Sequence, residues 1–216
     1  FSKIIDKYVK WASYEPEVEG VVIPFASIYG HTETAANILA CRLAELGVPV
    51  EMYDVSVSHY SHVLSDCFKY SHIVFAAPTF NNGIFDPMEH LLRDLAHHNL
   101  QNRKVALIQN GSWAPSSGKL MAEILGGMKN MEVMEAPITL KSALAPGQEG
   151  ELEALAQALA ASVKGGEPAP EAEPQQDKPK GFVCKICGFI YESDTLPDDY
   201  VCPICRRPAS DFEPVQ

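Results

Sequence analysis

Four of the six cysteines form two Cys-x-x-Cys pairs near the C-terminus, and this spacing constrains the fold of that region more than any other feature. The first pair is Cys184 and Cys187, and the second pair, Cys202 and Cys205, follows after 14 intervening residues. Two such pairs facing each other give the tetrahedral sulfur coordination of an iron or zinc site. Residues 181–216 are too few to build a hydrophobic core, so a bound metal is expected to supply the missing stability.

Two disulfides are the alternative use of these cysteines, and the compartment decides against them. The chain opens Phe-Ser-Lys-Ile-Ile-Asp, without a signal peptide, and no apolar run approaches the roughly 20 residues of a membrane span. We therefore expect a cytoplasmic protein, where reducing conditions favour a metal site over disulfides. The other two cysteines, Cys41 and Cys67, are expected to be ordinary core or surface thiols.

The segment from Val21 to Lys164 alternates β-rich runs with helical stretches. The predicted strands cover residues 21–25, 48–53, 72–76, 105–109 and 132–138, and the predicted helices cover 34–46, 61–70, 87–97, 118–128 and 149–163. This rhythm predicts an α/β fold, a doubly wound parallel five-stranded sheet with helices on both faces. Ligands of such sheets bind at the carboxyl ends of the strands, so the loops after strands one, three and four form the expected site.

The rest of the chain reads as a connector, a linker and a small second domain. Residues 1–20 hold apolar side chains at helical spacing, which predicts a connector that packs on a neighbour. Residues 165–180 are rich in proline and glutamate and contain no large apolar residue, so they read as a solvated linker. The predicted domains are therefore 21–164 and 181–216. The chain does not begin with methionine, so it is expected to be a piece of a longer protein.

The loop after the first strand has the residue types of a phosphate site. It reads Ser27-Ile28-Tyr29-Gly30-His31-Thr32, with hydroxyl groups around a glycine at a strand-to-helix turn. Backbone N–H groups and the helix dipole favour an anion there. A terminal phosphate suits this loop, and the Gly-x-Gly-x-x-Gly pattern of dinucleotide sites is absent. An ordinary hydroxyl N-cap is the alternative interpretation.

The other two loops carry aromatic and amide groups. The loop after the third strand reads Pro78-Thr79-Phe80-Asn81-Asn82-Gly83, and the loop after the fourth reads Asn110-Gly111-Ser112-Trp113. An isoalloxazine ring needs a stacking surface together with polar groups around its pyrimidine edge. A polar turn and a packed tryptophan are the alternatives for each loop alone. The three loops at one end of one sheet together predict an FMN site.

These motifs resemble those of the flavodiiron proteins. The run from Ile4 to Gly150 is similar to the flavodoxin-like half of that family, with His31 at a position where asparagine is more usual and with a shorter third loop. The C-terminal part resembles an abbreviated rubredoxin, with Arg206 at a position where glycine is usual. The resemblance implies FMN bound by the residues of the three loops, and one iron bound by the four paired cysteines. Structural zinc is the competing metal, since four cysteines are ordinary zinc ligands.

In the flavodiiron family, FMN passes electrons to a diiron centre that reduces oxygen or nitric oxide. The resemblance therefore implies an oxidoreductase module that carries electrons from an NAD(P)H-dependent rubredoxin reductase through iron and FMN to a diiron domain or subunit. No His-x-Glu-x-Asp-His stretch is present, so this chain alone is expected to have no diiron site and no catalytic residue of its own. A homodimer or homotetramer is the family expectation.

Two other functions fit the residues. A freestanding flavodoxin–rubredoxin carrier would serve separate acceptors, and a non-redox binding module would hold zinc in its small domain. The formal net charge of −11 argues against nucleic acid or an anionic membrane as the partner, because both would repel the chain.

Overall fold

The computed structural model describes residues 2–134, 136–165, 182–185, 190–191, 193, 196–197, 200–203 and 206–214. The chain divides into two compact units, residues 1–169 and 170–216. All of the predicted linker except Gly165 lies outside the described residues.

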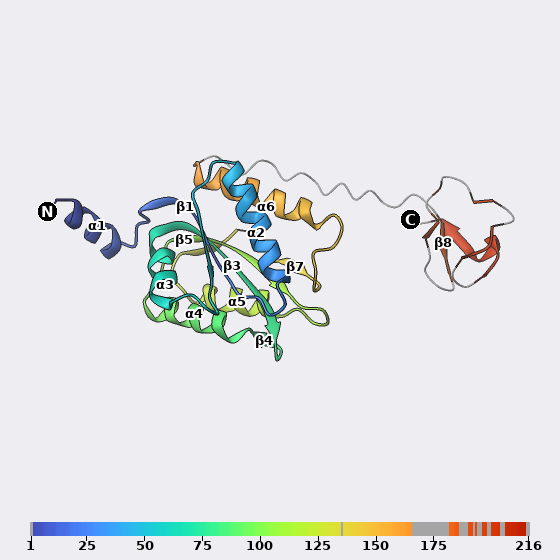
Figure 1. The fold of residues 1–216 in the computed structure, drawn as a ribbon, viewed down its shortest axis with the longest axis horizontal. Helices are drawn as coiled ribbons and strands as arrows, with labels where there is room; N and C mark the ends of the chain where they lie inside the picture. The colour runs from blue at the N-terminus through green and yellow to red at the C-terminus, as the bar shows by residue number, and fades with distance from the viewer. Residues whose placement is uncertain are drawn as a thin grey trace. The chain divides into compact units, whose positions relative to one another are not determined.

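The first unit is built on a parallel sheet whose strand order confirms the predicted fold class (Figure 1). Strands β2 (Val50–Asp54), β1 (Val18–Phe25), β3 (Tyr70–Phe80) and β5 (Arg103–Asn110) lie side by side in that order. The fifth position, beyond β5, is shared by β6 (Met131–Val133) and β7 (Ile138–Leu140). This is the flavodoxin-type order, in which the first strand stands between the second and third.

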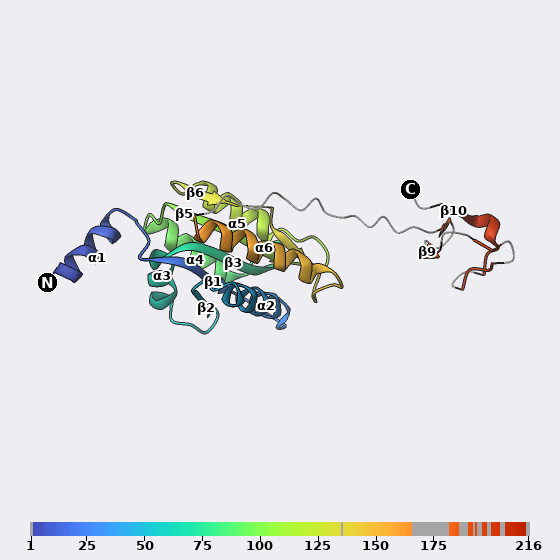
Figure 2. The ribbon, with the colours of Figure 1, turned by 90° about the horizontal axis from the view of Figure 1, so that it is seen from above.

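Helices cover both faces of this sheet (Figure 2). Helices α2 (His31–Glu45) and α6 (Gln148–Val163) cover one face, and α3 (Tyr60–Lys69), α4 (Asp86–His97) and α5 (Ser117–Gly126) cover the other. Each face has its own cluster of buried apolar side chains. Because β3 and β5 are buried on both faces, their sequences read as nearly continuous apolar runs.

Strand β3 is longer than the sequence predicts and ends in a hairpin. It continues through Pro78, Thr79 and Phe80, which pair on toward Asn110 of β5 or with the short antiparallel strand β4 (Gly83–Ile84). The two residues between β3 and β4, Asn81 and Asn82, have φ angles of 49° and 58°. Left-handed conformations at both central positions define a type I′ turn, which asparagine tolerates well. Part of the loop that was predicted after the third strand is therefore strand.

The fifth strand is interrupted where one strand was predicted over residues 132–138. After β6, the Met134 N–H still donates to the Val105 carbonyl, at 2.9 Å. Pro137, which precedes β7, has no N–H to offer to β5. The parallel pairing resumes with Ile138 opposite Ile108.

The residues before the sheet form helix α1 (Ser2–Ala12), which carries its apolar side chains in the open. Ile4 is 72% exposed, Tyr8 is 67% exposed and Trp11 is 45% exposed. The helical spacing predicted for this segment is confirmed. Contact with the sheet domain runs through Glu17, which accepts hydrogen bonds from the side chains of Lys7 and Trp11.

The second unit contains a small antiparallel sheet in the order β10 (Phe212–Pro214), β8 (Phe182–Cys184), β9 (Ile190–Tyr191), preceded at β10 by the 3₁₀ turn η1 (Ala209–Asp211). Its described core consists of Cys202 and Phe212, against which Tyr191, Tyr200 and two other partly buried side chains pack. Within the described part of the chain, no helix is long and apolar enough to cross a membrane.

Candidate functional site

A pocket lies at the carboxyl edge of the parallel sheet, where β1, β3 and β5 end. It encloses about 450 Å³ of empty space, part of it open to solvent. Its lining draws on all three predicted loops: Ser27, Ile28, Tyr29, His31, Thr32, Pro78, Thr79, Asn110, Gly111 and Ser112, together with Ser142. The fold thus brings most of the predicted site residues to one place.

The start of helix α2 supplies backbone donors to this pocket. Gly30 stands at the N-cap position with φ of 82°, and no side chain caps the helix. A left-handed residue here favours glycine, and a Cβ built on Gly30 would meet no atom within 4 Å. The N–H groups of the first turn therefore stay available to an anion at the positive end of the helix dipole. Thr32, in that turn, is only 2% exposed.

The hydroxyl of Ser27 is the clearest sign of a missing ligand. Its Oγ is buried and has no hydrogen-bond partner among the described residues. A buried hydroxyl without a partner costs free energy, so such groups usually meet a ligand or a bound water. Ser27 follows β1 directly and lines the pocket beside the uncapped turn of α2. A phosphate in this position would accept hydrogen bonds from the Ser27 hydroxyl and from the N–H groups of that turn.

Asn110 holds the pocket walls together with its own amide group. Its Nδ2 donates to the Ser142 carbonyl at 2.9 Å and to Thr32 Oγ1 at 3.3 Å, and its Oδ1 accepts from the Ser142 N–H at 2.9 Å. The side chain is 7% exposed. Asn110 was predicted as a flavin contact from its residue type, and the structure gives its amide a bracing task between three loops.

The hydroxyl of Thr79, like the amide of Asn110, forms its hydrogen bonds within the protein. Its Oγ1 accepts the N–H groups of Ser116 at 2.9 Å and Ser117 at 3.1 Å, and it donates to Ser117 Oγ at 3.3 Å. These bonds cap the first turn of α5 from the end of β3. Thr79 therefore fixes the end of β3 against the loop that precedes α5. Its remaining surface faces the pocket.

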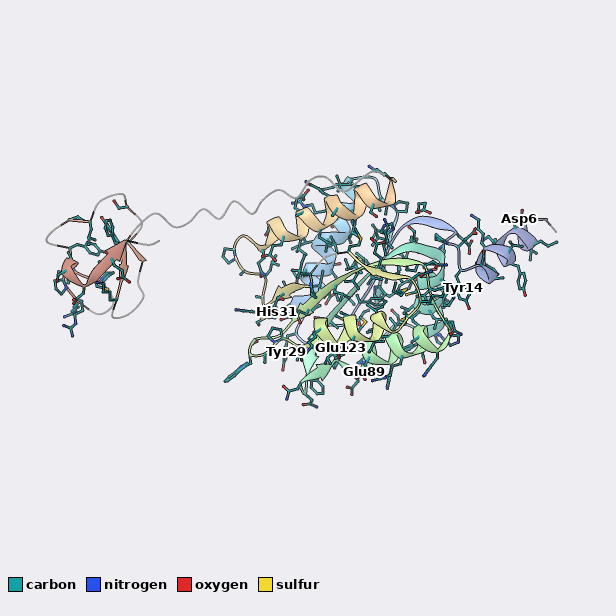
Figure 3. The ribbon with its side chains drawn as sticks, turned by 180° about the vertical axis from the view of Figure 1, so that it is seen from behind. Asp6, Tyr14, Tyr29, His31, Glu89 and Glu123 are labelled. Atoms are coloured by element: carbon teal, nitrogen blue, oxygen red, sulfur yellow. The ribbon has the colours of Figure 1, made fainter. Side chains whose placement is uncertain are left out.

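Aromatic side chains stand at the rim of the pocket without closing it. Tyr29 is 85% exposed and Trp113 is 98% exposed, and Figure 3 shows Tyr29 and His31 together at one end of the first unit. Phe80 packs edge-on against Phe85, with ring centroids 5.7 Å apart. Gly30, Trp113 and the hairpin residues 80–83 do not line the pocket, unlike the other predicted loop residues.

Two residues near the ends of β5 and β7, Gly111 and Ser142, have positions that the structure explains. A Cβ on Gly111 would lie 3.0 Å from Cα of Pro115, so the glycine is needed because the loop folds back on itself. Ser142, with φ of 77°, lines the pocket although the sequence did not single it out. It follows β7, so the rule that ligands meet the carboxyl ends of strands would have pointed to it.

The second unit places one of the four predicted metal ligands. Cys202 is fully buried beside Phe212, Tyr200 and their neighbours. Cys187, Cys205 and the side chain of Cys184 lie outside the described residues. The backbone of Cys184 pairs with Phe212 across β8 and β10. The donor chemistry of four cysteines around a buried, aromatic-lined thiol fits an iron or zinc ion.

The turn after Cys202 has the left-handed geometry that glycine usually provides. The Arg206 N–H donates to the Cys202 carbonyl at 2.9 Å, and the Cys202 N–H donates to the Arg207 carbonyl at 2.8 Å. Arg206 has φ of 57°, a conformation that costs a residue with a Cβ about 1–2 kcal/mol. The position where the resemblance expects glycine is therefore one where the backbone is left-handed.

The two cysteines of the first unit are not part of the pocket lining. Cys41 is exposed on α2, and Cys67 is completely buried on α3, where burial raises the pKa of its thiol far above the usual range. A thiol in that state is unreactive, in keeping with a packing role. Among the described residues, no group of three or more histidine, cysteine or acidic side chains could hold a metal ion.

Comparison with known families gives one match in each unit. A family model described as "Flavodoxin" matches residues 23–135, and a model described as "Rubrerythrin, rubredoxin-like domain" matches residues 182–213. The first match includes the Ser27–Thr32 loop and the ends of β3 and β5, and the second spans all four paired cysteines.

Two curated relatives have names that include the word rubredoxin. The "Rubredoxin-oxygen oxidoreductase" of Megalodesulfovibrio gigas is 27% identical over 74% of this chain and 39% of its own length. The "Anaerobic nitric oxide reductase flavorubredoxin" of Aeromonas hydrophila is 21% identical over 99% of this chain and 51% of its own length. The chain therefore spans about half or less of the length of these relatives.

The solved structure of the rubredoxin oxygen:oxidoreductase from Desulfovibrio gigas is similar in sequence as well as fold. It superimposes with a TM-score of 0.70 at 27% identity, covering 76% of this chain and 40% of that one.

Proposed function

Since the chain belongs to the flavodoxin family and ends in a rubredoxin-like domain, we propose that it carries electrons from a rubredoxin-type iron to FMN and on to the diiron centre of an oxygen or nitric oxide reductase. Its relatives are oxidoreductases by name. The chain has the flavodoxin and rubredoxin parts of such an enzyme, and the diiron centre belongs to another domain or subunit. When bound, the iron supplies a one-electron carrier, and FMN supplies a two-electron carrier that can release electrons singly.

The observation that carries the proposal is the pair of Ser27 and the uncapped turn of α2. The buried hydroxyl of Ser27 lacks a partner among the described residues, and the first-turn N–H groups beside Gly30 are free to donate hydrogen bonds to an anion. A terminal phosphate satisfies both without a lysine or arginine. Asn110 and Thr79 hold the surrounding loops in position through bonds within the protein, and the exposed ring of Tyr29 is free to turn over a flavin.

In the second unit, the four cysteines bind the iron and the side chains around Cys202 limit its contact with water. Phe212 and Tyr200 pack beside that thiol, with their ring centroids 5.5 Å apart. Dry surroundings and backbone N–H groups tune the potential of a thiolate-bound ion. We place the chain in the reducing cytoplasm, in a homodimer or homotetramer, with an NAD(P)H-dependent rubredoxin reductase as donor. The boundary between the two cofactor domains is proposed at residues 165–180.

The affinity of the purified chain for FMN tests the flavin part of the proposal. Ser27→Ala should weaken FMN binding by roughly 5- to 30-fold, because a hydrogen bond to a charged phosphate is lost. The cofactor-free variant should be as stable as the parent or more so, because a buried unpartnered hydroxyl has been removed.

The matched control is Ser65→Ala, at an exposed position of α3. This change should leave both FMN affinity and stability as they were. Equal FMN affinity in the Ser27→Ala variant, or no binding of FMN by the parent chain, would contradict the proposed site.

A further inference from the structure

A second pocket lies at the opposite, amino-terminal edge of the parallel sheet, and neither cofactor site uses it. It is a shallow hollow of about 660 Å³, much of it open to solvent. Figure 3 shows Tyr14, whose carbonyl lies at this edge, at the end of the first unit opposite Tyr29. The residues that matter for its chemistry are Ser71, His72, Arg103, Lys104 and Ser162.

Arg103 places a buried positive charge in the wall of this pocket. Its side chain is 1% exposed, and its Nη1 and Nη2 donate to backbone carbonyls, those of Tyr14, Gln101, Asn102 and Phe68. Its Nε is buried without a partner, and no ion pair among the described residues includes Arg103. A buried guanidinium whose hydrogen bonds go only to carbonyl groups is costly, and burial lowers the pKa of Arg103 to about 10, although Cys67 and Glu19 oppose this shift.

Lys104 brings a second positive charge, positioned by a chain of hydrogen bonds. Its Nζ donates to Ser162 Oγ at 2.8 Å, and the same oxygen lies 2.9 Å from His72 Nε2. On the other side of the ring, His72 Nδ1 lies 2.8 Å from Ser71 Oγ, which is 3.3 Å from the Gly20 carbonyl oxygen. Lysine can only donate, whereas a serine oxygen can accept two hydrogen bonds, so the arrangement fits either neutral tautomer of His72.

The hydrogen-bond chain leaves one kind of donor unused at the pocket. Ser162, His72 and Ser71 bond to one another in this chain, whereas Lys104 keeps two further N–H bonds and has no carboxylate partner among the described residues. Side-chain amides of Asn102 and Asn130 also line the pocket, and the charged donors that remain for a ligand are those of Lys104 and the Nε–H of Arg103. Both belong to cations, so the complementary ligand is an anion.

We propose that this pocket binds a phosphate group through Lys104 and Arg103. Phosphate carries about 1.5–2 negative charges at neutral pH, which matches two cations that lack carboxylate partners. Two exposed acidic side chains, Glu19 and Glu132, stand on the rim and oppose the anion, so millimolar binding is expected. The group could arrive as the free ion or as a phosphomonoester, and both offer the same oxygens.

Amide NMR of the full chain loaded with one equivalent of FMN and freed of excess tests this proposal, with inorganic phosphate as the probe at constant ionic strength. We expect saturable shifts at residues 71–72, 103–104 and 162, distinct from the residues of the Ser27–Thr32 loop. Lys104→Met should weaken binding at least 10-fold. Lys119→Met, whose side chain on α5 is 82% exposed, should have no effect. Glu132→Gln should tighten binding, because it removes a repelling charge.

Two further probes identify the source of the phosphate. Tighter binding of adenosine 5′-monophosphate than of phosphate indicates a phosphomonoester, and tighter binding of phosphate indicates the free ion. Shifts of the same residues with adenosine or, equally strongly, with acetate would overturn the proposal. It is also overturned if phosphate gives no saturable shift at these residues, or if Lys104→Met, folded as judged by its amide spectrum, binds phosphate as the parent does.

Discussion

The two units of this chain obtain their stability by different means. The flavodoxin-like unit buries apolar side chains on both faces of its sheet, among them Phe75 and Leu92, which are fully buried. The described core of the rubredoxin-like unit has two buried members, Cys202 and Phe212. Packing can hold the first unit in shape before any cofactor arrives, whereas the second must take much of its stability from metal–thiolate bonds.

Loss of a metal ligand should separate the two units most sharply. Cys202→Ser is expected to unfold the rubredoxin-like unit and leave the flavodoxin-like unit intact, because structural metal sites contribute about 10–16 kcal/mol of apparent binding energy in small domains. Amide NMR should lose the dispersed signals of residues 182–214 and keep those of the sheet domain. Cys41→Ser, at an exposed thiol, is the control and should change neither set. Native signals from the small unit in metal-free Cys202→Ser would refute this contrast.

A cavity in the larger core should have the opposite pattern. Phe75→Ala removes a fully buried ring from β3 and is expected to lower the free energy of unfolding of the first unit by about 3–5 kcal/mol. Denaturant unfolding followed by tryptophan and far-ultraviolet signals measures this loss. The metal content and the visible spectrum of the small unit should not change. A parallel loss of metal would mean that the two units do not fold independently.

Acid should weaken the larger unit through His72. Burial and the nearby Lys104 lower the pKa of His72 to about 4, while Glu19 opposes this shift. The unfolded chain, with a histidine pKa near 6.5, binds this proton first, so the contribution of neutral His72 is complete above about pH 6.5 and is lost as the pH falls toward 4. The loss is at most about 3 kcal/mol. Unfolding free energies of the parent and His72→Gln, compared between pH 7 and 4, should converge as the pH falls. His98→Gln, at an exposed site, should run parallel to the parent.

The smallest expected effect is in the backbone of the metal-binding turn. Arg206→Gly should stabilise the small unit by about 1 kcal/mol, because glycine adopts the observed left-handed conformation without a Cβ penalty. A rise in the midpoint of metal-loaded thermal unfolding would measure it. Destabilisation by this change would mean that the guanidinium contributes more than the turn costs.

The sheet could be predicted from the sequence because its central strands are buried on both faces. Residues 72–76 and 105–109 read as uninterrupted apolar runs, and helical patterns between them leave little choice of architecture. The hairpin formed by β4 was not predicted. It depends on both Asn81 and Asn82 taking left-handed conformations, which their side chains allow but do not require.

The site was predictable by residue type and position, but not by the use of each side chain. The loops after three strands converge because the parallel strands end at one edge. Sequence cannot tell that the polar atoms of Asn110 and Thr79 are already bonded within the protein, nor that the buried Ser27 Oγ lacks a partner among the described residues. Those facts depend on distances between segments more than 30 residues apart.

In the C-terminal unit, the sequence indicates the use of the side chains more directly than it does in the flavodoxin-like unit. The spacing of its cysteines alone predicts a metal site, since four thiolates in two short pairs would have few other uses in a reducing compartment. The choice between iron and zinc depends on how an ion is loaded and on small differences in its surroundings. The spacing of the cysteines gives no information about ion loading or about these surroundings.

The central claim is that one chain holds two redox centres that exchange electrons, and stopped-flow absorbance of the iron- and FMN-loaded protein tests it most directly. After mixing with a rubredoxin reductase and NADH, ferric–thiolate absorbance should bleach before flavin absorbance. The second phase should have a rate that is independent of protein concentration. A chain purified with zinc and no flavin, or a flavin that is reduced as quickly in the Cys202→Ser variant, would contradict the account.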